Sequence, residues 1–335
     1  MFGFRSDGKK VKGMSILEKA EPFFMPQRID AVNYTTVKVP CDTMDEFIAR
    51  ERRNGNSYNY MYLLMATIVR VLYIKPKLNR FIMRGTIYQR NTISISMDVK
   101  KKLEEDGENM TLKFYFTGRE SLPEIKKIVD DEISKNMQEG AVDKTTKAAG
   151  GLAKLPDFLF RWALALARWA DRHGMLPKKL IAASPFHTSC FFTNLKSIKL
   201  GYIYHHLYNF GTTSMFVAMG KEKMEPTVEN NKELKVKKIL TLGFSLDERV
   251  ADGFYMSKCL RLCNEILSNP DCLLESLPDN GTLPKQIVKK TKKTKTKKDK
   301  KVKDKKPKKI KPIKNKLKHD AKNKKLNKKT AQVNE

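Results

Sequence analysis

The chain of 335 residues carries 67 basic and 37 acidic side chains, a formal net charge of +30, and a hydrophobic fraction of 40%. This apolar content is enough for a sizeable core, so the composition excludes a wholly disordered protein. From residue 285 to the end, 24 lysines stand against 4 acids, so about two thirds of the excess charge lies in that stretch.

Five scattered cysteines exclude a disulfide framework, and none has the paired spacing of a zinc site. Cys259 and Cys263 are four residues apart, a spacing that favours shared burial on a helix over metal binding. The N-terminus lacks a leader pattern, and no stretch approaches the roughly 20 apolar residues of a membrane span. We therefore expect a cytoplasmic protein without a metal.

The first third of the chain contains signals for an arm, a strand and two helices. Residues 1–27 begin with a basic, Gly- and Ser-containing stretch and include Pro22 and Pro26, so we predict a loose arm. Residues 33–40 alternate as a strand does, and residues 43–53 begin with acids and end with arginines, as suits a helix dipole. The long apolar segment before Pro76 favours a buried helix.

Two segments with alternating apolar residues follow, 92–99 and 110–118. The Asp106-Gly107 pair between them predicts that they are neighbouring antiparallel strands. Ser121, followed by a proline and a glutamate, then predicts the start of a helix.

The pattern changes between residues 140 and 184. Within this stretch "LPDFLFRWALALARWADRHG" places tryptophans and leucines on one helical face and arginines on the other, and Gly174 ends the run. Such a helix docks on the same domain or on a partner subunit, or it lies on a membrane surface. His173, at its end, is best explained as a cation that stabilises the helix dipole.

Strands are predicted again at 188–195 and 213–220, then a polar hairpin, and then a buried strand and an amphipathic helix within 241–270. Strands and helices are mixed without a regular βαβ repeat. This order predicts an α/β layered sandwich of a mixed sheet and helices, and not a doubly wound fold.

The last strand and helix are joined by "LDERVADGF", which packs several charges into a short turn. This segment resembles the active-site segment of the chloramphenicol acetyltransferase-like superfamily. It is most similar to the catalytic domain of the dihydrolipoyl acyltransferases of 2-oxoacid dehydrogenase complexes, which carry His-x-x-x-Asp-Gly there. Asp247, Arg249, Val250, Asp252 and Gly253 match that pattern in register.

The resemblance extends beyond the turn. "YNYMYLLMATIVRVLYIKPKLN", "ISISMDV" and "FFTNLKSI" are similar to further segments of the family. The similarity covers roughly residues 28–275, which predicts an acyltransferase-like domain at 28–284 with 140–184 as an insertion. No lipoyl-bearing segment precedes it, so the resemblance implies a stand-alone catalytic-type domain without lipoyl attachment.

The resemblance implies a two-layer sandwich that assembles as a homotrimer, with coenzyme A thioester as a substrate and a small-molecule acceptor in a channel between subunits. By position, Thr193 would steady the tetrahedral oxyanion from a neighbouring subunit, and Asp252 would be the structural acid that holds an arginine. Arg28 is a candidate for that arginine. The resemblance assigns no coenzyme A-binding residues.

Glu248 occupies the position of the family histidine. A carboxylate of pKa near ~4.3 is a weaker base than an imidazole near ~6.5, although burial would raise its basicity. Three hypotheses follow: Glu248 is a tuned base, His205 or His206 substitutes for it, or the site is catalytically degenerate. His205 and His206 are better explained as turn residues packed among tyrosines. Glu248 is equally explained as a surface or salt-bridging acid, and Thr193 as a strand hydroxyl. A further histidine, His187, precedes the Thr193 strand.

Residues 285–329 are nearly free of aromatic and large apolar side chains, so we expect the tail 285–335 to be disordered. Its lysines would either bind nucleic acid or an anionic membrane surface without sequence preference, or only solvate the chain. The family resemblance implies a coenzyme A-dependent acyltransferase. The alternative is a degenerate trimeric scaffold whose tail binds polyanions.

Overall fold

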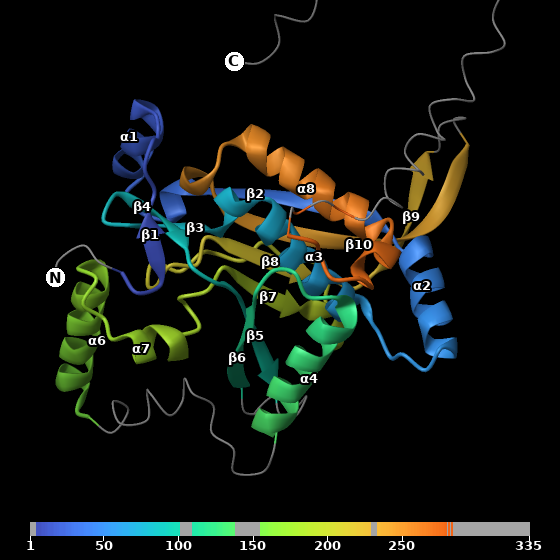
Figure 1. Cartoon of the computed structure of the whole chain (residues 1–335), viewed down its shortest axis with the longest axis horizontal. Coiled ribbons are helices and arrows are strands. Elements are labelled where there is room, and N and C mark those ends of the chain that lie inside the picture. Colours follow the sequence, from blue (N-terminus) through green and yellow to red (C-terminus); the bar gives the residue numbers. More distant parts are fainter. Residues whose placement is uncertain are drawn as a thin grey trace, which may run out of the picture. The chain divides into compact units, whose positions relative to one another are not determined.

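The computed structural model describes residues 5–100, 109–137, 155–228, 233–279, 281 and 283, and the chain divides into two units, 1–290 and 291–335. The predicted lysine tail and the first part of the predicted insertion lie outside the described residues. The first unit is a mixed sheet with helices packed on it (Figure 1). This confirms the predicted α/β class.

The main sheet has seven strands in the order β2-β10-β8-β7-β5-β6, with β9 paired to β10. The strands are β2 (Val32–Pro40), β5 (Ile93–Lys100), β6 (Asn109–Phe116), β7 (Cys190–Asn194), β8 (Met215–Met219), β9 (Lys223–Val228) and β10 (Leu234–Asp247). β7 runs parallel to both β5 and β8, and the other neighbours are antiparallel. The sheet is therefore mixed, and the predicted pairing of the strands now named β5 and β6 is confirmed.

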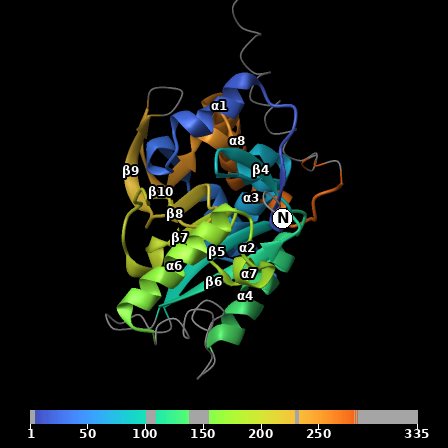
Figure 2. The same ribbon diagram turned by 90° about the vertical axis from the view of Figure 1, so that its left-hand side faces the viewer.

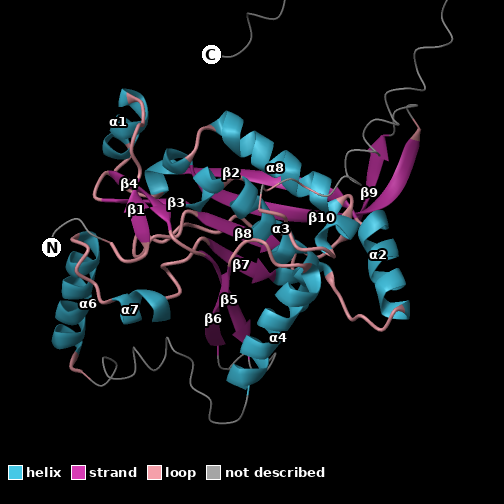
Figure 3. Ribbon diagram, in the orientation of Figure 1, coloured by secondary structure: helices cyan, strands magenta, loops and turns pink. Residues whose placement is uncertain are grey.

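Helices cover one face of this sheet, as the cyan ribbons of Figure 3 show. They are α2 (Asp42–Arg53), α3 (Tyr60–Ile74), α4 (Leu122–Met137) and α8 (Gly253–Leu267). α3 packs between α4 and α8 and is buried on most of its surface, which explains its continuous apolar sequence. Asn59 caps its start. Pro76 follows its end, as predicted from the sequence.

The opposite face of the sheet carries buried polar side chains beside a small apolar cluster that includes Phe191 and Phe216, and extended chain crosses it. Side chains alternate between the two faces along a strand, and the neighbours of these polar residues belong to the helix-side core. The side chains on the opposite face therefore include Thr241 and Ser245 on β10 and Ser94 and Ser96 on β5. Residues 201–204 cross this face so closely that a Cβ on Gly243 would lie 2.3 Å from the Ile203 carbonyl oxygen. Glycine at this position lets the backbone lie directly on the sheet.

The N-terminal segment differs from its prediction. Instead of a loose arm, it contains β1 (Gly8–Lys10) and α1 (Ile16–Phe24). β1 joins β3 (Arg80–Met83) and β4 (Thr86–Arg90) in a second, three-stranded sheet of order β1-β4-β3. A reciprocal capping box between Ser15 and Glu18 starts α1, and the proline inside this helix lies in its second half.

The described part of the insertion forms α6 (Asp157–Arg172) and α7 (Lys178–Ala183). Figure 2 shows α6 on the side of this unit that faces the viewer. The only buried residue of α6 is Asp171, and Trp162 and Leu166 are 74% and 63% exposed. Within the described residues the apolar face of α6 is thus largely uncovered, and its contact with a partner subunit or a membrane surface stays a prediction.

Among the described residues, every helix is too short or too polar to cross a bilayer. The five cysteines are all buried and unpaired, as expected for Cys259 and Cys263.

Candidate active site

The charged turn lies where β10 ends at Asp247, with a short 3-10 turn, Glu248–Val250, before α8. Asp247 is buried and accepts hydrogen bonds from Nε and Nη2 of Arg249 at 2.8 and 2.6 Å. Arg249 also donates from Nη1 to the Met25 carbonyl oxygen at 2.6 Å. This two-point ion pair fixes the turn from within and ties it to the end of α1.

Asp252 has a different role from the one the resemblance implies. Its Oδ1 accepts the backbone N–H of Tyr255 at 2.8 Å and so caps α8. Arg28 is buried and donates to the carbonyl oxygens of Tyr208, Asn209 and Gly211. The expected Arg28–Asp252 pair is therefore wrong for the single chain, because backbone acceptors engage Arg28 and the helix start engages Asp252.

Glu248 is half-buried, and its Oε2 accepts a hydrogen bond from the Asn33 amide at 2.5 Å. A second carboxylate lies near it. Burial raises the pKa of Glu21 on α1, and the negative charges of Glu18, Glu248 and Asp252 raise it further. Glu248 thus belongs to a small acidic group at the turn, which sequence reasoning missed because α1 was taken as a loose arm.

Thr193 lies far from Glu248 within one chain. It pairs with Ala218 on β8, and Ala218 pairs with Gly243 on β10. Glu248 follows five residues after Gly243, which corresponds to roughly 16 Å along an extended strand. The two residues can share a site only if a second copy of the chain supplies one of them.

The two adjacent histidines lie on the extended segment over the polar face of the sheet. The His205 ring stacks on Phe216 with centroids 3.9 Å apart, and burial lowers its pKa. Phe216 pairs with Ser245, which lies three residues before Glu248. His205 is therefore separated from Glu248 by roughly 10 Å along the strand. His206 is exposed and contacts Tyr208 edge-on. Both contacts agree with turn histidines packed against aromatic neighbours.

His187, in contrast, belongs to a buried polar network. Its Nε2 lies 3.1 Å from Oδ1 of Asp171, and its Nδ1 lies 2.8 Å from Oγ of Ser184. Arg5 donates to the same Asp171 carboxylate at 2.9 Å and to Asp7 at 2.8 and 3.0 Å. Burial opposes ionisation, but His187 and Arg5 hold the pKa of Asp171 below its usual range. The ion pairs thus anchor the N-terminus and α6 to the segment before β7.

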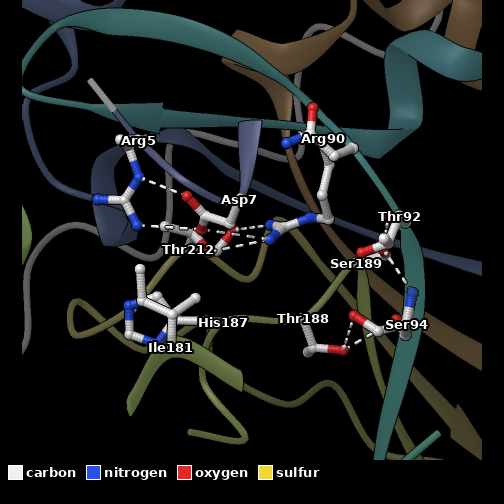
Figure 4. A network of polar contacts seen from close by, with 12 residues as sticks. Arg5, Asp7, Arg90, Thr92, Ser94, Ile181, His187, Thr188, Ser189 and Thr212 are labelled. Carbon is white, nitrogen blue, oxygen red and sulfur yellow. Dashed lines mark hydrogen bonds and ion pairs between the residues drawn. The ribbon is translucent and has the colours of Figure 1, made fainter. Parts of the chain in front are cut away.

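Figure 4 shows how this network continues toward the sheet. Arg90 donates to the Thr212 hydroxyl at 3.1 Å and to its carbonyl at 2.8 Å, and burial lowers its pKa to about 10. Lys113 donates to three carbonyl oxygens, and burial lowers its pKa to about 7. These contacts are structural, because each cation is used by backbone or carboxylate acceptors of the chain itself. Within the described ranges no three metal-ligating side chains come together.

Comparisons with known proteins bear on the turn directly. Residues 212–275 match the family model of the 2-oxoacid dehydrogenases acyltransferase (catalytic domain). The matched segment begins just before β8 and ends just after α8, so it contains the Asp247–Arg249 pair, Glu248 and Asp252. A comparison with curated proteins finds no match.

Three solved structures show a distant likeness. A dihydrolipoamide acetyltransferase of Azotobacter vinelandii has 14% identity and a TM-score of 0.48, over 79% of this chain and 94% of that one. The cubic core of the pyruvate dehydrogenase multienzyme complex has 13% identity and a TM-score of 0.48, over 79% of this chain and 94% of that one. A chloramphenicol acetyltransferase has 12% identity and a TM-score of 0.46, over 78% of this chain and 99% of that one. The family match to residues 212–275 confirms the resemblance of this chain to the acyltransferase catalytic domain of 2-oxoacid dehydrogenase complexes.

Proposed function

We propose that this protein transfers an acyl group between coenzyme A and a small acceptor, at sites built between copies of the chain. The observation that carries the proposal is the family match to residues 212–275, a segment in which a buried strand and an ion-paired turn hold Glu248. By the resemblance, Glu248 takes the place of the family histidine. No metal and no lipoyl attachment are part of the proposal.

In the proposed reaction the Glu248 carboxylate takes the proton of the acceptor thiol or hydroxyl while the acceptor attacks the thioester carbonyl. The oxyanion accepts a hydrogen bond from the Thr193 hydroxyl of a second copy. Collapse of the tetrahedral intermediate breaks the C–S bond, and the leaving thiolate takes the proton back. A carboxylate is a weaker base than an imidazole toward a thiol of pKa about 8.5, so we expect a slow enzyme.

The proposed assembly is a homotrimer, supported by the separation of Thr193 from Glu248 within one chain. The exposed apolar side chains of α6 are available for contact with another copy. Location in the cytoplasm stays a prediction from the sequence.

The test is release of free thiol from acetyl-CoA by the full chain, with a panel of small thiols and alcohols as acceptors. Glu248→Gln removes the base with little change in shape, and we expect a loss of about 10²-fold or more. Glu265→Gln, an exposed carboxylate on α8, is the matched control and should keep full activity. Thiol release by Glu248→Gln at the wild-type rate would refute Glu248 as the base.

A second candidate is a degenerate trimer that acts as a binding scaffold. The bond from Asn33 to Oε2 favours it, because a carboxylate with a structural partner needs no catalytic role. Glu248→His would then create activity that the wild type lacks. The proposed polyanion binding by the tail would be tested by retention on heparin or RNA after deletion of 285–335, and unchanged retention would refute it.

A further inference from the structure

A large cavity lies beside the charged turn. Its volume is about 980 Å³, and it is bordered by the end of α1, the β3–β4 turn, the last turns of α6 and residues 209–211. Its lining includes Arg249 but neither Glu248 nor Thr193. The volume is that of sites for small organic ligands rather than for single ions.

The cavity is strongly basic. Five arginines line it, against one acid, Asp171, which is already paired with Arg5. Arg249 is neutralised by Asp247, but Arg84, Arg168 and Arg172 have no carboxylate partner within the described part of the chain. Three guanidinium groups, from the β3–β4 turn and from α6, therefore border the cavity, and their positive charges are not balanced by carboxylates of described residues.

Arg168 and Arg172 lie four residues apart on α6, so their like charges repel across one helical turn. An anion between them would remove this repulsion. The partly exposed rings of Trp169 and Phe23 also line the cavity and offer apolar surface beside the charges.

Arg84 has a backbone conformation that is unfavourable for a residue with a side chain. It has φ of +50° in a two-residue hairpin turn with Gly85, where asparagine and glycine are the preferred residues. Non-glycine residues with such backbone angles gather at ligand sites. A ligand that binds this guanidinium is a physical reason for arginine at this position.

Arg28 also lines the cavity. It is 6% exposed, and its Nε is buried without a partner among the described residues. Burial lowers the pKa of Arg28 to about 10, although nearby Asp247 favours the charged form. Arg28 therefore adds to the lining a further cation that has no carboxylate partner among the described residues.

We propose that this cavity binds a small molecule that carries an oligophosphate group. Guanidinium forks match phosphate oxygens in pairs, and several free arginines require an anion of more than one charge. The inference does not rest on acyl transfer, because neither Glu248 nor Thr193 lines the cavity.

The test is isothermal titration of the full chain with inorganic pyrophosphate, adenosine 5′-diphosphate and adenosine. We expect the two phosphate compounds to bind and adenosine not to bind. The double variant Arg168→Gln, Arg172→Gln should weaken binding by roughly tenfold or more, since charge-assisted hydrogen bonds are lost. Arg84→Gly should weaken it with the turn preserved, because glycine adopts the same backbone angles.

Arg161→Gln is the matched control, because Arg161 is exposed on α6 and lies outside the cavity lining. Equal weakening in Arg161→Gln would show nonspecific attraction to a polycation and overturn the proposal, as would absence of pyrophosphate binding or equal binding of adenosine. Glu248→Gln should bind as the wild type does, which separates this inference from the acyltransferase proposal. Thermal unfolding of each variant shows that it is folded.

Discussion

The two faces of the main sheet use the same strands for different purposes. The helix side is a continuous apolar core that includes Phe114, Phe192 and Leu242, each at most 1% exposed. The other side buries polar groups under extended chain, as where Ser96 donates to the Pro185 carbonyl oxygen at 2.9 Å. Packing on one side thus supplies stability, while directed polar contacts on the other side position the turn, the inserted helix and the cavity.

The largest effect is expected from the helix side. Phe114→Ala leaves a cavity in the core and should lower the free energy of unfolding by roughly 3–5 kcal/mol in a urea titration. Its neighbour Tyr115 points to the other face and is 44% exposed, so Tyr115→Ala should cost far less. Equal losses would contradict the assignment of the two faces.

The buried ion pairs rank next. Asp171→Ala removes the shared partner of Arg5 and His187 and should cost roughly 3 kcal/mol, because a buried cation loses part of its compensation. Asp157→Ala, at the exposed start of the same helix, is the control and should cost below ~1 kcal/mol. A small effect of Asp171→Ala on urea unfolding would mean that the network does not anchor α6.

The close approach of residues 201–204 to the sheet gives a smaller effect. Gly243→Ala places a Cβ against the Ile203 carbonyl and should destabilise the fold by roughly 1–3 kcal/mol. Gly253→Ala, at the start of α8 with open space around it, should be neutral or slightly stabilising. If thermal unfolding ranks the two variants in the reverse order, the crossing segment does not lie on Gly243.

The smallest effect at neutral pH concerns Lys113. Its folded pKa of about 7 lies below the unfolded value of about 10.4, so between these pH values the unfolded chain holds a proton that the folded protein has released. The contribution of Lys113 to stability therefore rises with pH across this window. Urea midpoints measured from pH 7 to 10 should rise more steeply in the wild type than in Lys113→Met. Identical slopes would show that the lysine is not buried.

Much of the main sheet could be predicted because its strands alternate clearly between core and polar residues. β3 and β4 were missed because the arginines and glutamine between residues 80 and 90 hide the alternation. α1 was missed because its prolines suggested a loop, although Ser15 and Glu18 have the spacing of a capping box.

The site was only partly predictable. The Asp247–Arg249 pair is local, so the turn could be located from the sequence alone. The contact of Arg5 with Asp171 joins residues 166 positions apart, and no local pattern announces it. The single chain also separates Thr193 from Glu248, and intersubunit geometry cannot be inferred from the order of residues.

The most direct test of the account is activity of mixed assemblies. Glu248→Gln and Thr193→Ala variants, each expected to be impaired, are co-expressed with different tags, isolated as mixed oligomers and assayed for thiol release from acetyl-CoA. If each site takes Glu248 from one copy and Thr193 from the next, every mixed trimer restores one of its three sites, which is about a third of the wild-type sites. We predict this recovery. Activity no higher than that of the separate variants would contradict a site shared between copies.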